Sequence, residues 1–130
     1  MKEPIRVLIV DDEARFRQTT EKLLRRKGFE PIMAGTGEEA LGKLSERPDV
    51  VVLDVKMPAM DGHQVLREIK SRKPELPVIM LTGHGRKPSA TVAMEEGAAC
   101  YLTKPCDIDT LAARIEEVYR SVETGVPEKA

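Results

Sequence analysis

Short apolar runs alternate with amphipathic segments five times along this chain, and each apolar run has the length of a strand. The predicted strands are residues 5–10, 31–34, 50–54, 77–81 and 98–102. The predicted helices are residues 14–27, 61–73 and 88–96, together with a second helix that opens at Thr36 and a fifth that includes Ile108 to Tyr119. Such alternation is typical of parallel strands joined by crossover helices. The sequence therefore predicts an α/β domain with a five-stranded parallel sheet and five helices.

Local signals set the helix ends. Thr36 and Glu39 have the spacing of a capping box, which predicts that the second helix begins there and includes Leu44. Gly28 and Gly97 stand where the first and fourth helices are expected to stop. The third strand, residues 50–54, is apolar up to its last residue, and this favours a strand buried on both faces.

Length and composition narrow the class of protein. With 130 residues, we expect one domain at residues 4–122 and a frayed tail at 123–130. The 21 basic and 22 acidic residues nearly cancel, so we expect no direct nucleic-acid or membrane binding. No apolar stretch approaches roughly 20 residues and the N-terminus lacks the apolar core of a signal peptide, which favours a cytoplasmic protein. Cys100 and Cys106 match no metal or redox spacing and are interpreted as small buried apolar residues.

Polar side chains follow several of the predicted strands. Asp11 and Asp12 follow the first strand, Asp54 ends the third, and Thr82 follows the fourth. Because the carboxyl ends of parallel strands share one edge, where ligands bind, we expect these side chains to lie close together. Three neighbouring carboxylates repel one another and require a proton or a cation, and oxygen ligands in an open site favour Mg²⁺.

This cluster suggests phosphoryl chemistry. With its charge neutralised by a divalent ion, Asp54 could attack a phosphorus atom and form an acyl phosphate. A hydroxyl and a fixed cation would then be needed near the phosphoryl oxygens, and Thr82 and Lys104 occupy suitable strand ends. Taken singly, each residue has an ordinary alternative: a helix cap for Asp11 or Asp12, a turn for Thr82, a solvated charge for Lys104.

At these residues the chain resembles the receiver domain of two-component response regulators. The resemblance covers residues 4–122. Its motifs are Asp11-Asp12, Asp54 with Met57-Pro58 and Asp61-Gly62, Leu81-Thr82-Gly83, and Tyr101-Leu102-Thr103-Lys104-Pro105. It implies a doubly wound, flavodoxin-like receiver fold with strand order 2-1-3-4-5.

The resemblance also implies a function. Asp54 would accept a phosphoryl group from a sensor histidine kinase or a histidine phosphotransfer protein. Mg²⁺ would be bound by Asp12, Asp54 and the backbone carbonyl of Lys56, with Asp11 supporting through water. The chain would be a signalling domain and not an enzyme, catalysing only its own phosphorylation and dephosphorylation.

A switch from the phosphoryl group to a partner surface is implied as well. Thr82, Lys104 and Tyr101 would connect the phosphoryl group to a surface on the fourth helix, fifth strand and fifth helix. Tyr101 has an ordinary core or sheet position as its alternative. That surface would act on a downstream protein target or on an output domain outside this chain, as a monomer or a weak phosphorylation-dependent dimer.

Four further residues lie in informative places. Lys56 and His84 stand two residues after Asp54 and Thr82 and are predicted to tune the phosphoryl lifetime. The alternative is that Lys56 contributes only its carbonyl and that His84 is a solvent-facing loop residue. Pro105 is a candidate for a cis peptide bond. Cys106 stands where the family very often has Phe, which puts the packing at the foot of the fifth helix in question.

Two other functions have specific weaknesses. An aspartyl phosphatase of similar site would need a second Asp two residues after the nucleophile, and that position here is Lys56. A nucleotide-binding α/β domain would need a glycine-rich phosphate loop after the first strand, where this chain has Asp11-Asp12-Glu13. A phosphomonoester turnover assay and a nucleotide titration would distinguish these two from the leading interpretation.

Overall fold

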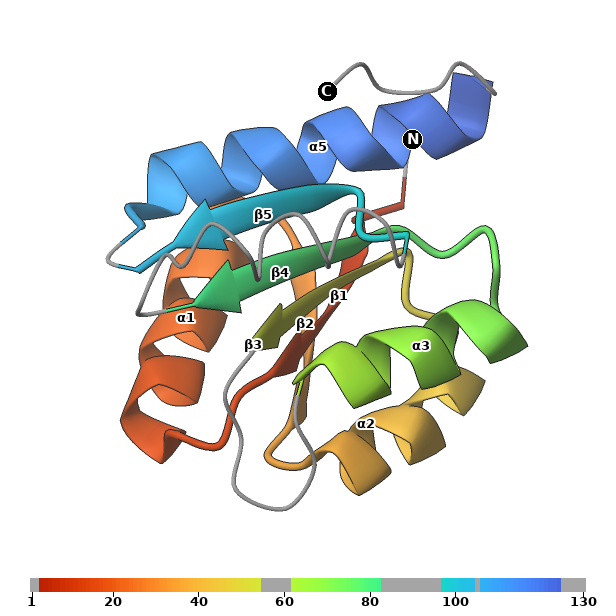
Figure 1. Ribbon diagram of the computed structural model, residues 1–130. Coiled ribbons are helices and arrows are strands. Elements are labelled where there is room, and N and C mark those ends of the chain that lie inside the picture. The colour runs from red at the N-terminus through yellow and green to blue at the C-terminus, as the bar shows by residue number, and fades with distance from the viewer. Residues whose placement is uncertain (1–2, 55–61, 83–96, 105, 125–130) are drawn as a thin grey trace.

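A five-stranded parallel sheet forms the centre of the molecule, in the order β2-β1-β3-β4-β5 (Figure 1). The structure is a computed structural model that describes residues 3–54, 62–82, 97–104 and 106–124. The strands are β1 (Arg6–Val10), β2 (Glu30–Ala34), β3 (Val50–Asp54), β4 (Val78–Thr82) and β5 (Cys100–Thr103). The five strands confirm the prediction from the residue pattern, and their order confirms the one that the family resemblance implies.

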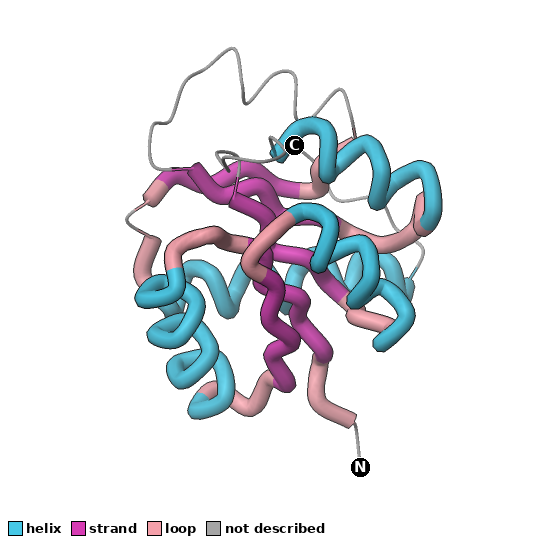
Figure 2. The backbone as a smooth tube through the Cα atoms, turned by 90° about the horizontal axis from the view of Figure 1, so that it is seen from below, coloured by secondary structure: helices cyan, strands magenta, loops and turns pink. Residues whose placement is uncertain are grey.

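Helices cover both faces of this sheet. They are α1 (Ala14–Arg26), α2 (Gly37–Lys43), α3 (Gly62–Arg72) and α5 (Ile108–Thr124). Figure 1 shows α1 and α5 on one face and α2 and α3 on the other, and Figure 2 shows the strands between the two helical layers. The predicted fourth helix, residues 88–96, lies outside the described residues. Within the described residues, no helix is long and apolar enough to cross a membrane.

Each face of the sheet has its own apolar core. One cluster packs beneath α2 and α3 and includes Leu8, Leu53, Leu66 and Ile69. The other packs beneath α1 and α5 and includes Ile9, Leu24, Val52 and Ile115. All five residues of β3 are buried, because helices cover the sheet on both sides of this central strand. The expectation of a strand buried on both faces is confirmed.

The second helix begins as predicted but ends earlier. The Thr36 hydroxyl accepts a hydrogen bond from the Glu39 N–H at 3.0 Å, and the Glu39 carboxylate accepts one from the Gly35 N–H at 2.6 Å. This is a capping box whose returning bond reaches one residue before the N-cap. Leu44, expected within the α-helix, instead opens the 3₁₀ turn η1 (Leu44–Glu46). Arg47 then takes a left-handed conformation, which reverses the chain toward β3.

The C-terminal helix α5 has a side-chain cap at its start. Asp107 caps it, because its carboxylate accepts a hydrogen bond from the Thr110 N–H at 2.7 Å. The helix continues to Thr124, two residues past the expected domain boundary. Residues 125–130 lie outside the described residues, so the frayed tail stays a prediction.

Candidate functional site

Three carboxylates meet at the carboxyl edge of the sheet. Asp11 follows β1 directly, and Asp54 is the last residue of β3, which pairs with β1 up to Val10 and Leu53. Asp11 and Asp54 are 1% and 6% exposed, whereas Asp12 is exposed. One carboxylate oxygen from each of the three residues lies within 4.8 Å of the others, close enough to hold one metal ion. The predicted clustering of these acids is therefore present.

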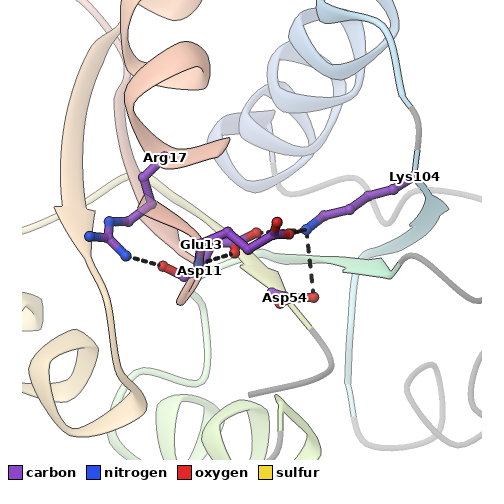
Figure 3. Close-up of polar contacts among 5 residues, drawn as sticks. All are labelled: Asp11, Glu13, Arg17, Asp54 and Lys104. Atoms are coloured by element: carbon purple, nitrogen blue, oxygen red, sulfur yellow. Dashed lines mark hydrogen bonds and ion pairs between the residues drawn. The ribbon is translucent and has the colours of Figure 1, made fainter. Parts of the chain in front are cut away.

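The Lys104 ammonium lies between two of these acids (Figure 3). Its Nζ is 2.8 Å from Asp11 Oδ2 and 3.9 Å from Asp54 Oδ1. A longer contact of 3.7 Å reaches the exposed Glu13 carboxylate. The Lys104 side chain is 16% exposed, so this cation is largely removed from bulk water and its attraction to the acids is weakly screened. Part of the repulsion among the carboxylates is thus offset by the protein itself.

Asp11 is held by contacts at each of its oxygens. Its Oδ2 accepts from Lys104, and its Oδ1 accepts from the Glu13 N–H at 2.9 Å. Its backbone carbonyl accepts from Arg17 Nη1 at 2.6 Å, a contact drawn in Figure 3. A side chain at Gly35 would lie 3.0 Å from that guanidinium, so glycine leaves room for Arg17. These contacts fix the turn that carries the acidic pair.

An aromatic ring approaches Lys104 from α1. The ammonium lies 4.1 Å from the centroid of the Phe16 ring, within the range of a cation–π interaction. Phe16 stands in the first turn of α1 and is half-buried against the core beneath α1 and α5. The cation therefore has carboxylates and the face of a π system among its neighbours.

The remaining predicted site residues are distributed as follows. Thr82 ends β4 beside Thr103 of β5, so its backbone reaches the same edge. Tyr101 lies in β5, half-buried against the core beneath α2 and α3, and its buried hydroxyl has no hydrogen-bond partner among the described residues. Lys56, His84 and Pro105 lie outside the described residues, and their predicted roles stay predictions.

Three contributors to this site were not predicted from the sequence. The residue pattern gave no site role to Phe16, Glu13 or Arg17. All three lie in the first residues after the acidic pair, where the chain turns from β1 into α1. Their position in the sequence could have identified them, because residues that directly follow a strand lie beside its carboxyl edge.

The two cysteines form no disulfide and are half-buried, packing at the margin of the core beneath α1 and α5. Burial raises the pKa of the Cys106 thiol, and the neighbouring Asp107 carboxylate acts in the same direction. Cys106 therefore stays a thiol at neutral pH. Although the Cys106 side chain is smaller than the Phe that is frequent in the family at this position, it contacts this core.

A hollow of about 700 Å³ lies at the other end of the sheet. It is lined by segments that precede β3 and β4 and by the C-terminal part of α5. None of the predicted site residues lines it. The carboxylates and the lysine at the carboxyl edge, and not this hollow, therefore identify the candidate site.

Comparison with known proteins agrees with this geometry. The sequence profile of the response regulator receiver domain matches residues 7–116. The chain is 37% identical over 118 residues to the response regulator MprA of Mycolicibacterium vanbaalenii, covering 90% of this chain and 51% of that protein. It is 36% identical over 123 residues to the alkaline phosphatase synthesis transcriptional regulatory protein PhoP of Bacillus subtilis, covering 94% and 51%. The chain thus spans about half the length of these relatives.

Solved structures show the same fold. A CheY-like response regulator receiver domain protein from Methanospirillum hungatei superposes with a TM-score of 0.89 at 28% identity, covering 94% of this chain and 98% of that one. A response regulator receiver domain protein from Clostridium thermocellum gives 0.87 at 38% identity, covering 92% and 97%. Fold, motif order and sequence similarity agree, and the chain belongs to the receiver domain family of two-component response regulators.

Proposed function

We propose that Asp54 is the phosphoacceptor of this receiver domain and that its donor is the phosphohistidine of a sensor kinase or histidine phosphotransfer protein. The observation that carries this proposal is the environment of the Asp54 carboxylate. It is buried at the carboxyl edge of the sheet, clustered with Asp11 and Asp12, and 3.9 Å from the Lys104 ammonium.

The donor set fits a divalent cation of the Mg²⁺ type, because all three side chains offer carboxylate oxygens. Asp12 and Asp54 would hold the ion together with the Lys56 carbonyl. Asp11 would support it through water, since both of its oxygens already accept hydrogen bonds from the protein. When bound, Mg²⁺ would offset the negative charge and coordinate phosphoryl oxygens.

The chain's own residues account for the transfer. A carboxylate oxygen of Asp54 attacks phosphorus, the phosphorus–nitrogen bond of the donor breaks, and its electron pair returns to the imidazole. Lys104 would contact a phosphoryl oxygen, and its ammonium lying 3.9 Å from Asp54 Oδ1 supports this role. Thr82, at the neighbouring strand end, would donate its hydroxyl to another oxygen.

The same proposal includes the output step, in which phosphorylation changes a partner-binding surface. Thr82, Lys104 and Tyr101 would relay phosphorylation to the surface of the fourth helix, β5 and α5. A downstream protein or an attached output domain would bind there, and the longer relatives include a transcriptional regulatory protein. Lys56 and His84 would set the lifetime, and the Lys104–Pro105 bond would be cis. The domain, residues 4–122, would act in the cytoplasm as a monomer or weak phosphorylation-dependent dimer.

An acyl phosphate donor provides the test. Incubated with Mg²⁺ and the donor, the wild-type protein should gain one phosphoryl group by intact mass, and Asp54→Asn should gain none. Asp49→Asn is the matched control, because Asp49 precedes β3 at the opposite end of the strand, and it should be labelled like the wild type. Continued release of phosphate from a generic phosphomonoester would instead indicate a phosphatase.

A further inference from the structure

The Lys104 ammonium is attracted from several directions at once. Asp11, Asp54 and Glu13 carboxylates lie 2.8, 3.9 and 3.7 Å away, and the Phe16 ring centroid lies 4.1 Å away. These groups come from the ends of two strands, from the turn before α1 and from its first turn. Figure 3 shows the long Lys104 side chain reaching from β5 across to the acids.

Carboxylates alone do not determine one position for such a cation. A lysine side chain is a flexible four-carbon stem ending in a compact charge, and three acids within 4 Å, of which only Asp11 is at hydrogen-bond distance, leave it more than one favourable position. A ring face attracts the cation along a defined direction and also packs against the stem. Because Phe16 is half-buried in the core beneath α1 and α5, its ring is itself held in place.

We propose that Phe16 is a positioning residue that holds the Lys104 ammonium between Asp11 and Asp54 through a cation–π contact. Lys104 is then in place before a phosphoryl group arrives, and little rearrangement is needed to contact it. This last step depends on the proposed phosphoacceptor role of Asp54. The placement of Lys104 does not, because it concerns the unphosphorylated protein alone.

NMR relaxation of the Lys104 side-chain methylene groups tests the placement directly. In the unphosphorylated protein, Phe16→Leu keeps an apolar side chain and removes the π face, so Lys104 should become markedly more mobile. Phe16→Trp restores a stronger π face and should keep Lys104 ordered. Phe29→Leu is the matched control, because Phe29 lies in the same core cluster but makes no ring contact with Lys104. If Lys104 remains equally ordered in Phe16→Leu, the inference is wrong.

The consequence for phosphorylation is tested by a double-mutant cycle. With an acyl phosphate donor and Mg²⁺, Phe16→Leu should slow labelling about fivefold, which corresponds to ~1 kcal/mol, and Phe16→Trp should restore the rate. In a Lys104→Met background, Phe16→Leu should have no further effect. An equal effect in both backgrounds would show that Phe16 does not act through Lys104. Absence of labelling in the wild type would refute the phosphoacceptor proposal, while the relaxation measurement would still decide the placement.

Discussion

Removing the Lys104 charge should reveal how strongly the site's carboxylates repel one another. Lys104→Met keeps an apolar stem of similar length and removes the ammonium. Asp11, which is 1% exposed, then loses its donor at 2.8 Å, and Asp54 loses a cation at 3.9 Å. The Glu13 N–H remains on the other Asp11 oxygen, so the carboxylate is left with reduced and uncharged support.

The magnitude follows from these distances and burials. With an effective dielectric constant of about 20, the 2.8 Å pair has a gross attraction of roughly 6 kcal/mol. Desolvation of both ions offsets much of this, and removing one partner of a buried pair typically costs about 3–5 kcal/mol. Because the Lys104 side chain is 16% exposed and the site opens at the sheet edge, we expect about 2–3 kcal/mol of lost unfolding free energy.

Urea denaturation in the presence of a chelator measures this loss. Lys27→Met is the control, because Lys27 pairs with Asp109 on the surface, where ion pairs contribute only about 0–1 kcal/mol. Added Mg²⁺ should stabilise Lys104→Met more than the wild type, since the ion no longer competes with an ammonium for the acids. A tenfold gain in affinity adds roughly 1.4 kcal/mol at saturating ion. Wild-type stability in the chelator together with a wild-type Mg²⁺ response would show that Lys104 does not offset the repulsion among these carboxylates.

Three other residues, two at the same site and one at the start of α5, provide further tests. Asp12→Ala should weaken Mg²⁺ binding in a calorimetric titration and, in a chelator, leave the fold as stable or more so; unchanged affinity would remove Asp12 from the ligand set. Lys56→Ala should shorten the acyl phosphate half-life several-fold at low salt and less at high salt, as followed by loss of labelled phosphate; an unchanged half-life would leave only the Lys56 carbonyl with a role. The Thr110 N–H holds the pKa of Asp107 below its usual value, so its stabilisation is present at neutral pH and lost as pH falls through that lowered pKa. Asp107→Ala should therefore lower the Tm at pH 7, and its difference in Tm from the wild type should shrink below about pH 4. A difference in Tm that stays constant with pH would contradict this explanation.

Much of the fold is determined by local patterns that a reader of the sequence can recognise. The run Val50–Leu53 is continuously apolar because helices cover both faces of β3, and such runs are typical of parallel sheets. Asp11 and Asp54 could be placed together for the same reason, since parallel strands deliver their carboxyl ends to one edge. Their clustering needed no knowledge of side-chain packing.

Other features depend on packing between distant segments and could not be read in this way. Helical spacing indicates that Phe16 faces inward, but it does not show that Lys104 crosses from β5 to lie over the ring. The early end of α2 could not be predicted from the residue pattern either. Leu44 is buried in the 3₁₀ turn as it would be in an α-helix, so the apolar spacing does not distinguish the two kinds of helix. The contacts of Arg17 and Glu13 arise from the turn that follows β1, whose shape the residue pattern leaves open.

Chemical trapping of the phosphoryl group identifies the acceptor residue itself. An acyl phosphate on an aspartate is reduced by borohydride to homoserine, so the acceptor is identified as a residue of changed mass in a peptide digest. After phosphorylation with an acyl phosphate donor and Mg²⁺, the account predicts homoserine at position 54, and none there when either the donor or Mg²⁺ is omitted. Homoserine at position 11 or 12, or a phosphoryl group that resists borohydride, would contradict the assignment of Asp54 as the phosphoacceptor.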